Sequence, residues 1–227
     1  MKIFPLQNNV NFRGATININ AFSDTHGNLE LADRGLQTLM KNKEDVFEKE
    51  EKGKENFLIV GGDWFISGGK TGYLTDPNKP LMKFQGEMLN KFIGKVKEKY
   101  PMTKSIFVPG NHETDGGIEI FSQAMRNIDA DVIISNLDFK NSYLMQDAID
   151  EGRVIGEKIT VVQDDKDPNK KYPVLNLGVM PTNLEFYLND HDGLELVENC
   201  RVPQKYVSSN QTQKTRELIK KRIEEFK

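Results

Sequence analysis

Short apolar runs alternate with segments of helical spacing along the first 136 residues. The apolar runs have the length of strands, and they comprise Thr16–Phe22, Phe57–Val60, Ser105–Val108 and Val132–Ser135. Apolar residues three and four positions apart predict the intervening helices, which comprise Leu29–Met40, Leu81–Val96 and Ile118–Asn127. Each of the first three strands is thus followed by a helix. Three such units in succession predict a parallel sheet with right-handed crossovers.

The pattern becomes richer in strands beyond the fourth apolar run. Three further runs, Val154–Ile155, Ile159–Val162 and Val174–Met180, are predicted strands. A polar turn separates the last two, which predicts a hairpin. We expect this part of the chain to form a second sheet packed on the first. The final segment, Thr212–Lys227, has the spacing of an amphipathic helix.

Composition narrows the classes of protein that this chain can be. The net charge of −3, from 31 basic and 34 acidic residues, lacks the polybasic character of nucleic-acid-binding proteins. Cys200 is the single cysteine, so the chain has no internal disulfide framework. No run of about 18 apolar residues would span a membrane. The first residues lack the apolar segment of a signal peptide, so we expect a cytoplasmic protein unless a leader has been removed.

Polar and charged residues directly follow each of the first three predicted strands. They are Asp24 and His26 after the first strand, Asp63 after the second, and Asn111, His112 and Glu113 after the third. The carboxyl ends of parallel strands meet at one edge of a sheet, which is where open α/β sheets bind ligands. Carboxylate, imidazole and amide groups together suit Mn, Fe or Zn. A carboxylate such as that of Asp63 can bridge two ions about 3.5–4 Å apart, an arrangement that polarises a phosphoryl group.

Each of these residues also has an ordinary structural interpretation when it is taken alone. An aspartate after two glycines, such as Asp63, is typical of a helix cap, and Asn111 suits a left-handed turn. His112 alone is more typical of a loop than of a catalytic site, and we interpret His191 as part of a surface turn. The pair Trp64-Phe65 is expected to pack in the core rather than to line a pocket.

Taken together, the motifs D-x-H, G-D and G-N-H-[D/E], in this order and after strands, resemble those of the calcineurin-like metallophosphoesterases. The resemblance extends over residues 17–136 by motif. Within that family, Gly110–Asp115 and Ile134–Asp138 are similar to the 5′-nucleotidase branch. The resemblance implies an α/β fold, a layered αββα sandwich, formed as a single domain over residues 1–227. It also implies two divalent metal ions and a small-molecule phosphoester substrate, with a nucleotide as the leading substrate class.

By matching position, the resemblance also implies a role for each motif residue. The metal ligands would be Asp24 and His26 at the first ion, Asp63 between the two ions and Asn111 at the second. His112 would lie near the leaving-group oxygen, where it stabilises charge or donates a proton. Asp115 would orient His112 and favour its charged form, because an adjacent carboxylate raises the pKa of a histidine. Glu113 is expected to hold the loop rather than to contact the substrate.

The later histidine motifs of the family are absent from this sequence, whose three histidines are His26, His112 and His191. We therefore expect the N-terminal part of a longer protein, with the sandwich incomplete at its C-terminal side. Such a chain should bind the first metal weakly, bind the pair poorly and show little or no phosphatase activity. The competing interpretation is a metal-free α/β binding or scaffold domain with a degenerate phosphoesterase site. Its stability would not depend on divalent cations, and neither interpretation predicts an oligomeric state.

Overall fold

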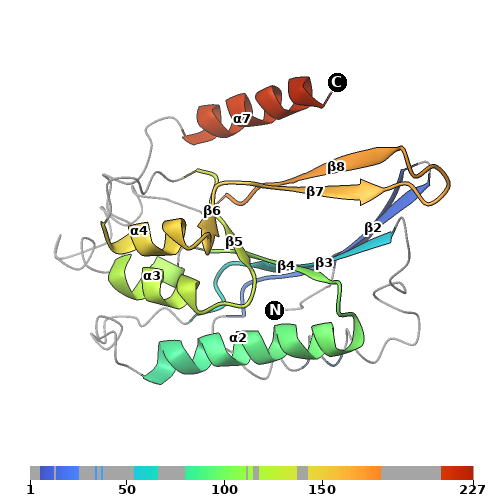
Figure 1. The fold of residues 1–227 in the computed structure, drawn as a ribbon. Helices are drawn as coiled ribbons and strands as arrows, with labels where there is room; N and C mark the ends of the chain where they lie inside the picture. Colours follow the sequence, from blue (N-terminus) through green and yellow to red (C-terminus); the bar gives the residue numbers. More distant parts are fainter. Residues whose placement is uncertain are drawn as a thin grey trace.

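The computed structural model describes residues 6–12, 14–25, 54–65, 80–110, 112–114, 118–136, 143–179 and 211–226, together with residues 34 and 37. These residues form a six-stranded sheet and a two-stranded sheet, with helices on both outer sides (Figure 1). The layers of the described part therefore run α, β, β, α, which confirms the predicted α/β fold class.

The larger sheet has the strand order β1-β2-β3-β4-β5-β6. Its strands are β1 (Leu6–Phe12), β2 (Ala15–Phe22), β3 (Lys54–Gly61), β4 (Lys104–Val108), β5 (Asp131–Ile133) and β6 (Val154–Ile155). Strands β2 to β6 are parallel, and β1 pairs antiparallel with β2. Because strands that follow one another along the chain are neighbours, the carboxyl ends of β2, β3 and β4 lie side by side.

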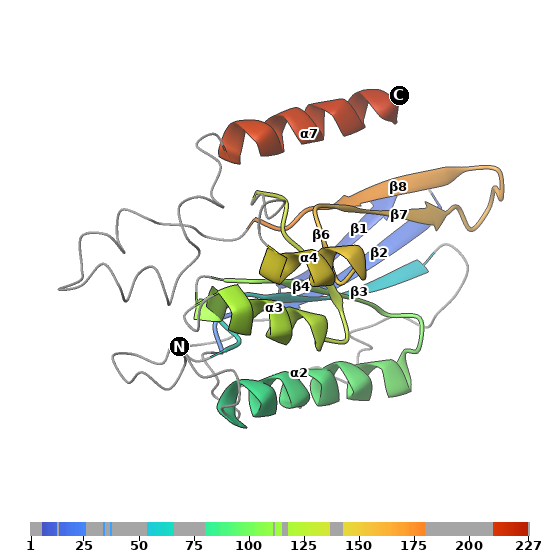
Figure 2. The same ribbon diagram turned by 60° about the vertical axis from the view of Figure 1, so that its left-hand side comes forward.

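Helices and a hairpin cover the two faces of the larger sheet (Figures 1 and 2). The helices on one face are α2 (Pro80–Lys99), α3 (Ile118–Arg126) and α4 (Tyr143–Asp150). The hairpin of β7 (Lys158–Gln163) and β8 (Lys171–Asn176) covers the other face. Helix α7 (Gln211–Glu225) lies beyond the hairpin in both views, and the short 3-10 helix η2 (His112–Thr114) follows β4.

Side chains of β3 alternate between two hydrophobic cores. Leu58 and Val60 belong to a cluster that includes Ile93 of α2, on the helical face. Phe57 belongs to a second cluster that includes Val162 of β7, on the hairpin face. Burial on both faces is the reason that this strand is a continuous apolar run in the sequence.

The structure corrects three of the predicted strands. Val154–Ile155, which we placed with the second sheet, forms β6 and pairs in parallel with β5 of the larger sheet. β5 ends before Ser135, because the backbone N–H of Ser135 donates to the carbonyl oxygen of Gly178 (2.7 Å) beyond the hairpin. β8 begins earlier than predicted, at Lys171, because this polar segment pairs in register with the end of β7.

The hydrophobic pattern does not predict β1 or α4. β1 is mostly polar, and it forms because it pairs along its whole length with β2, from Leu6 opposite Ala21 to Phe12 opposite Ala15. Of the helix predicted over Leu29–Met40, only residues 34 and 37 are described, and both are helical. Within the described residues, none of the helices combines the length and the apolar character needed to cross a membrane.

Candidate active site

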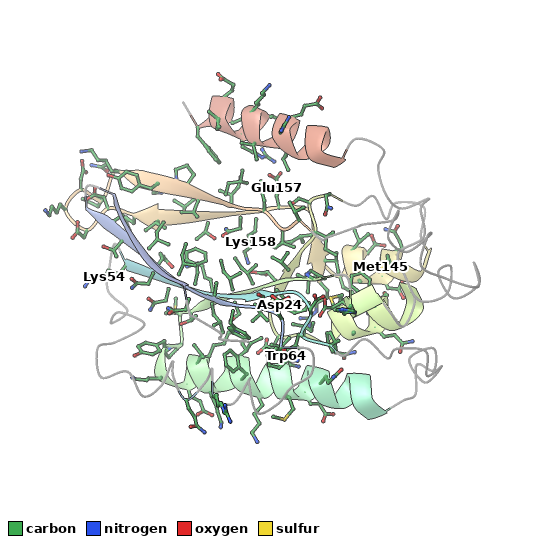
Figure 3. The ribbon with its side chains drawn as sticks, turned by 180° about the vertical axis from the view of Figure 1, so that it is seen from behind. Asp24, Lys54, Trp64, Met145, Glu157 and Lys158 are labelled. Carbon is green, nitrogen blue, oxygen red and sulfur yellow. The ribbon has the colours of Figure 1, made fainter. Side chains whose placement is uncertain are left out.

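The ends of β2 and β3 pack directly against each other. The backbone N–H of Asp24 donates to the carbonyl oxygen of Gly62 at 3.0 Å. A Cβ added at Gly61 would lie only 2.9 Å from the Cβ of Ser23. Figure 3 shows Asp24 at this end of the sheet, with Trp64 nearby on the side of α2. Asp24 of the D-x-H motif and Gly62 of the G-D motif, which follow separate strands, are therefore in direct contact.

Asp24 and Asp63 share an unusual backbone conformation. Their φ angles are 57° and 59°, in the left-handed region that few residues other than glycine adopt. Each lies two residues beyond the end of its strand, Phe22 in β2 and Gly61 in β3. The same turn is thus repeated at neighbouring strand ends, and strain of this kind is concentrated at functional sites.

The carboxylate of Asp63 connects the β3 end to the β4 end. Its Oδ1 accepts a hydrogen bond of 3.1 Å from the backbone N–H of His112. A Cβ added at Gly110 would lie 2.2 Å from this same oxygen, and one added at Gly62 would lie 1.8 Å from the backbone nitrogen of Gly110. The two loops approach so closely that only glycine fits at both positions.

Glu113 is fully buried and accepts hydrogen bonds from four backbone N–H groups. Oε2 accepts from Asp63 (2.9 Å) and Gly110 (2.5 Å), and Oε1 accepts from Trp64 (2.8 Å) and Phe65 (3.1 Å). Burial raises the pKa of the Glu113 carboxyl to about 7, a rise that the charge of Asp63 increases and the backbone hydrogen bonds oppose. The prediction that Glu113 holds the loop is confirmed.

Trp64 and Phe65 anchor the β3 end to the helical layer. The indole N–H of Trp64 donates to the carbonyl oxygen of Gln85 in α2 (2.9 Å). The Trp64 ring also lies against Phe22 and Phe92, with ring centroids 5.9 and 6.2 Å away. Phe65 is completely buried. Both side chains belong to the core, as predicted, and they keep the loop that carries Asp63 in place.

Comparison with known proteins identifies the family. The family model of calcineurin-like phosphoesterases matches residues 17–210. The chain belongs to this family. Among solved structures, the fold is similar to that of NAD nucleotidase from Haemophilus influenzae, with a TM-score of 0.38 and 16% sequence identity. That match covers 79% of this chain and 27% of the nucleotidase. A search of curated proteins found no match.

In this calcineurin-like phosphoesterase, the structure describes half of the predicted site residues. Asp24, Asp63 and His112 lie at the ends of three neighbouring strands and are joined by the contacts above. His26, Asn111 and Asp115 lie outside the described residues, as does His191. Among the described residues, no three His, Cys, Asp or Glu side chains are grouped as a metal site would require.

A fourth strand end joins the two sheets at Ser135, just after β5. The hydroxyl of Ser135 donates to the carbonyl oxygen of Gly156 (2.5 Å) and accepts from the backbone N–H of Gly178 (3.1 Å). The next residue, Asn136, is buried. In the sequence, Ser135 ends the predicted strand Val132–Ser135, and Ile134–Asp138 contributes to the family resemblance. A serine at such a position carries no signal of its contact with Gly178, 43 positions away.

Proposed function

We propose that this chain carries part of a dinuclear metal centre for the hydrolysis of phosphoesters. The observation that supports the proposal is the repeated left-handed turn that places Asp24 and Asp63 at neighbouring strand ends. Carboxylate oxygens are ligands that divalent cations prefer. The Asp63 carboxylate accepts from the backbone N–H of His112 through Oδ1, and a carboxylate has a second oxygen with which it can bind a cation. The residues present therefore fit a metal ion.

The ligand assignment follows the position of each residue in the motifs. Asp24 and His26 would hold the first ion, Asp63 would lie between the ions and Asn111 would hold the second. When bound, the ions supply electrostatic stabilisation of the phosphoryl oxygens. The close approach of Gly62 to Gly110 keeps bulky side chains away from this edge.

His112 is proposed to act as the general acid for the leaving group. Its backbone N–H is held by the carboxylate of Asp63, which fixes the start of the loop beside the candidate metal ligands. From there its imidazole would donate a proton to the leaving-group oxygen. Asp115 would orient the ring and favour the charged form, since a neighbouring carboxylate raises the pKa of a histidine.

A nucleotide is the proposed substrate class. The support is the similarity of Gly110–Asp115 and Ile134–Asp138 to the 5′-nucleotidase branch of the family. Because His26, His112 and His191 are the only histidines in this sequence, the chain supplies too few imidazole ligands for both ions. We therefore propose that it holds half of the centre and has little or no activity by itself.

The test is thermal melting of the chain with and without excess Mn²⁺, for the wild type and for Asp24→Ala. A ligand that binds only the native state at a hundred times its Kd stabilises it by about 2.7 kcal/mol. For a chain of this size that corresponds to a rise in melting temperature of roughly 5–10 °C. Asp24→Ala should abolish the rise.

The matched control is Asp129→Ala. Asp129 is exposed and pairs with Lys97 before β5, at the opposite edge of the sheet from Asp24. This variant should keep the full response to Mn²⁺. A wild-type chain that shows no response at any Mn²⁺ concentration would reject the metal centre and favour the scaffold domain. Turnover of a generic phosphoester at the rate of a complete family member would reject the half-site.

A further inference from the structure

We propose that Glu113 is a positioning residue that sets the direction of the Asp63 carboxylate toward the metal centre. Glu113 does not itself ligate a metal, because its two oxygens are occupied by backbone N–H donors. The inference rests on the proposed function in one respect, which is that Asp63 is a metal ligand. It adds a residue from η2, after β4, that determines the geometry of a ligand just beyond the end of β3.

The two oxygens of Glu113 have different tasks. Oε2 accepts from the backbone of both Asp63 and Gly110, so a single atom joins the β3 end to the β4 end. Oε1 accepts from Trp64 and Phe65, the two residues that follow Asp63. Three consecutive N–H groups are thus bound by one carboxylate. This arrangement holds the chain in the turn that begins with the left-handed Asp63.

Asp63 and Glu113 act on each other's loops. The Glu113 carboxylate binds the backbone N–H of Asp63, and the Asp63 carboxylate binds the backbone N–H of His112, which precedes Glu113. The contacts close a ring through both loops. If the Glu113 carboxylate is altered, the backbone of Asp63 is released, and the Asp63 carboxylate loses the orientation in which it accepts from His112.

The burial of Glu113 argues for a role in geometry rather than in stability alone. A fully buried carboxylate loses its hydration, and burial disfavours its charged form. An apolar side chain would fill the same space without that penalty, whereas only a group with two acceptor oxygens can bind four converging N–H donors. Outer-shell groups that orient a ligand typically change metal affinity 10- to 100-fold when they are replaced.

The experiment compares Glu113→Gln with Asp164→Asn. Asp164 is a matched control because it is also buried and accepts from the backbone N–H groups of Lys166 and Asp167 and from the hydroxyl of Tyr172. It lies beside Gly14, before β2, and therefore at the opposite end of that strand from Asp24. In both variants, an amide replaces one acceptor oxygen with a donor.

Three measurements distinguish a role of Glu113 in orienting Asp63 from a role in the stability of the fold. They are the melting temperature, the Mn²⁺ affinity from the loss of the free-ion EPR signal, and amide hydrogen exchange. Both variants should melt at a lower temperature. Glu113→Gln alone should weaken Mn²⁺ binding at least ten-fold. It should also speed exchange at the His112 amide, whose acceptor is Asp63 rather than Glu113. If Glu113→Gln does not fold, Glu113→Asp is used in its place. This variant keeps the carboxylate, but its side chain is one methylene shorter, so the oxygens no longer reach the four N–H groups and the same changes are expected.

The outcomes distinguish this inference from the proposed function. Wild-type Mn²⁺ affinity and unchanged His112 exchange in the folded variant would overturn the positioning role. If the wild type binds no Mn²⁺, the proposed function fails. The His112 amide then still reports on the Asp63 carboxylate: faster exchange in Glu113→Gln supports the positioning of Asp63, and unchanged exchange overturns it.

Discussion

Asp24 and Asp63 have nearly identical left-handed backbones, with φ of 57° and 59°, two residues beyond the neighbouring strands β2 and β3. The left-handed conformation costs an ordinary residue roughly 1–2 kcal/mol, and asparagine and aspartate visit it most readily after glycine. Glycine would adopt the same turn without strain, but it would supply no carboxylate. The presence of aspartate at both positions therefore indicates that the carboxylate, rather than the shape of the turn, is the reason for the residue type.

Replacement of Asp63 with asparagine should distinguish the role of Asp63 as a metal ligand from its role in the left-handed turn. Asparagine tolerates the left-handed backbone, and its side-chain oxygen can still accept from the N–H of His112. The melting temperature should therefore change by less than about 3 °C, roughly 1 kcal/mol, whereas Mn²⁺ affinity should fall at least roughly ten-fold. Calorimetric titration with Mn²⁺ and a melting curve measure both. Unchanged affinity would show that Asp63 is not a ligand.

Gly110→Ala should displace the Asp63 carboxylate. The added Cβ would lie 2.2 Å from Oδ1 of Asp63 and 2.6 Å from its backbone nitrogen, so one of the two loops must move. We expect a loss of about 1–3 kcal/mol in the free energy of unfolding, together with weaker Mn²⁺ binding. Gly94→Ala in α2 is the control, since a Cβ there meets nothing within 4 Å. It should raise stability by roughly 0.5–1 kcal/mol. Equal effects in the two variants would contradict this account.

Gly14→Ala should destabilise the opposite end of β2. Gly14 has a φ of +101°, and a Cβ there would lie 2.4 Å from a carboxylate oxygen of Asp164. Strain and overlap together should cost about 2–3 kcal/mol, or roughly 4–12 °C in melting temperature. Gly152→Ala separates backbone strain from steric overlap. Gly152 has a φ of +67°, but a Cβ added there would have no atom within 4 Å. It should cost about 1 kcal/mol. Denaturant unfolding of both variants gives the comparison.

Acid should release α7 from the hairpin layer. Arg222 of α7 donates from Nε to both carboxylate oxygens of Glu157 (3.1 and 3.0 Å), and this hydrogen bonding holds the pKa of Glu157 below its ordinary value of 4.5. A carboxyl with a lowered pKa takes up its proton more readily in the undocked state. The contribution of the pair is therefore complete above about pH 4.5 and is lost as the pH falls through the folded-state pKa.

The release of α7 can be followed by the NMR shifts of its amides between pH 7 and pH 3. Arg222→Ala should produce the shifts of the acidified wild type already at pH 7. Lys221→Ala removes an ion pair with Glu225 within the helix and only a weak charge interaction with Glu157, so it should leave α7 docked. An Arg222→Ala spectrum that matches the wild type at pH 7 would show that other contacts hold the helix.

The hydrophobic pattern predicted the elements that have a strong local period. The predicted helices at Leu81–Val96 and Ile118–Asn127 are confirmed as α2 and α3, since an amphipathic face is visible over a few turns of sequence. The buried strands β3 and β4 are confirmed for the same reason. The motifs could be assigned to one edge of the sheet because parallel strands present their carboxyl ends together. These predictions needed only information from neighbouring residues and a general rule of topology.

Pairing choices could not be predicted in the same way. β1 is polar and forms only because β2 offers a free edge, and β6 is too short for its sequence to favour one sheet over the other. Both depend on hydrogen bonds to strands far along the chain, and such pairings are decided when the whole sheet assembles.

The sequence by itself determined the alternation of the strands β2, β3 and β4 with the helices α2 and α3, and the family to which the chain belongs. Only the tertiary structure decided the left-handed turns at Asp24 and Asp63 and the four backbone N–H groups that Glu113 binds. Glu113 and Asp63 are 50 positions apart in the sequence, and their contact exists because β3 and β4 are neighbours. The sequence shows that a motif contains a carboxylate. The N–H groups that this carboxylate binds depend on how loops that are distant in the sequence pack together.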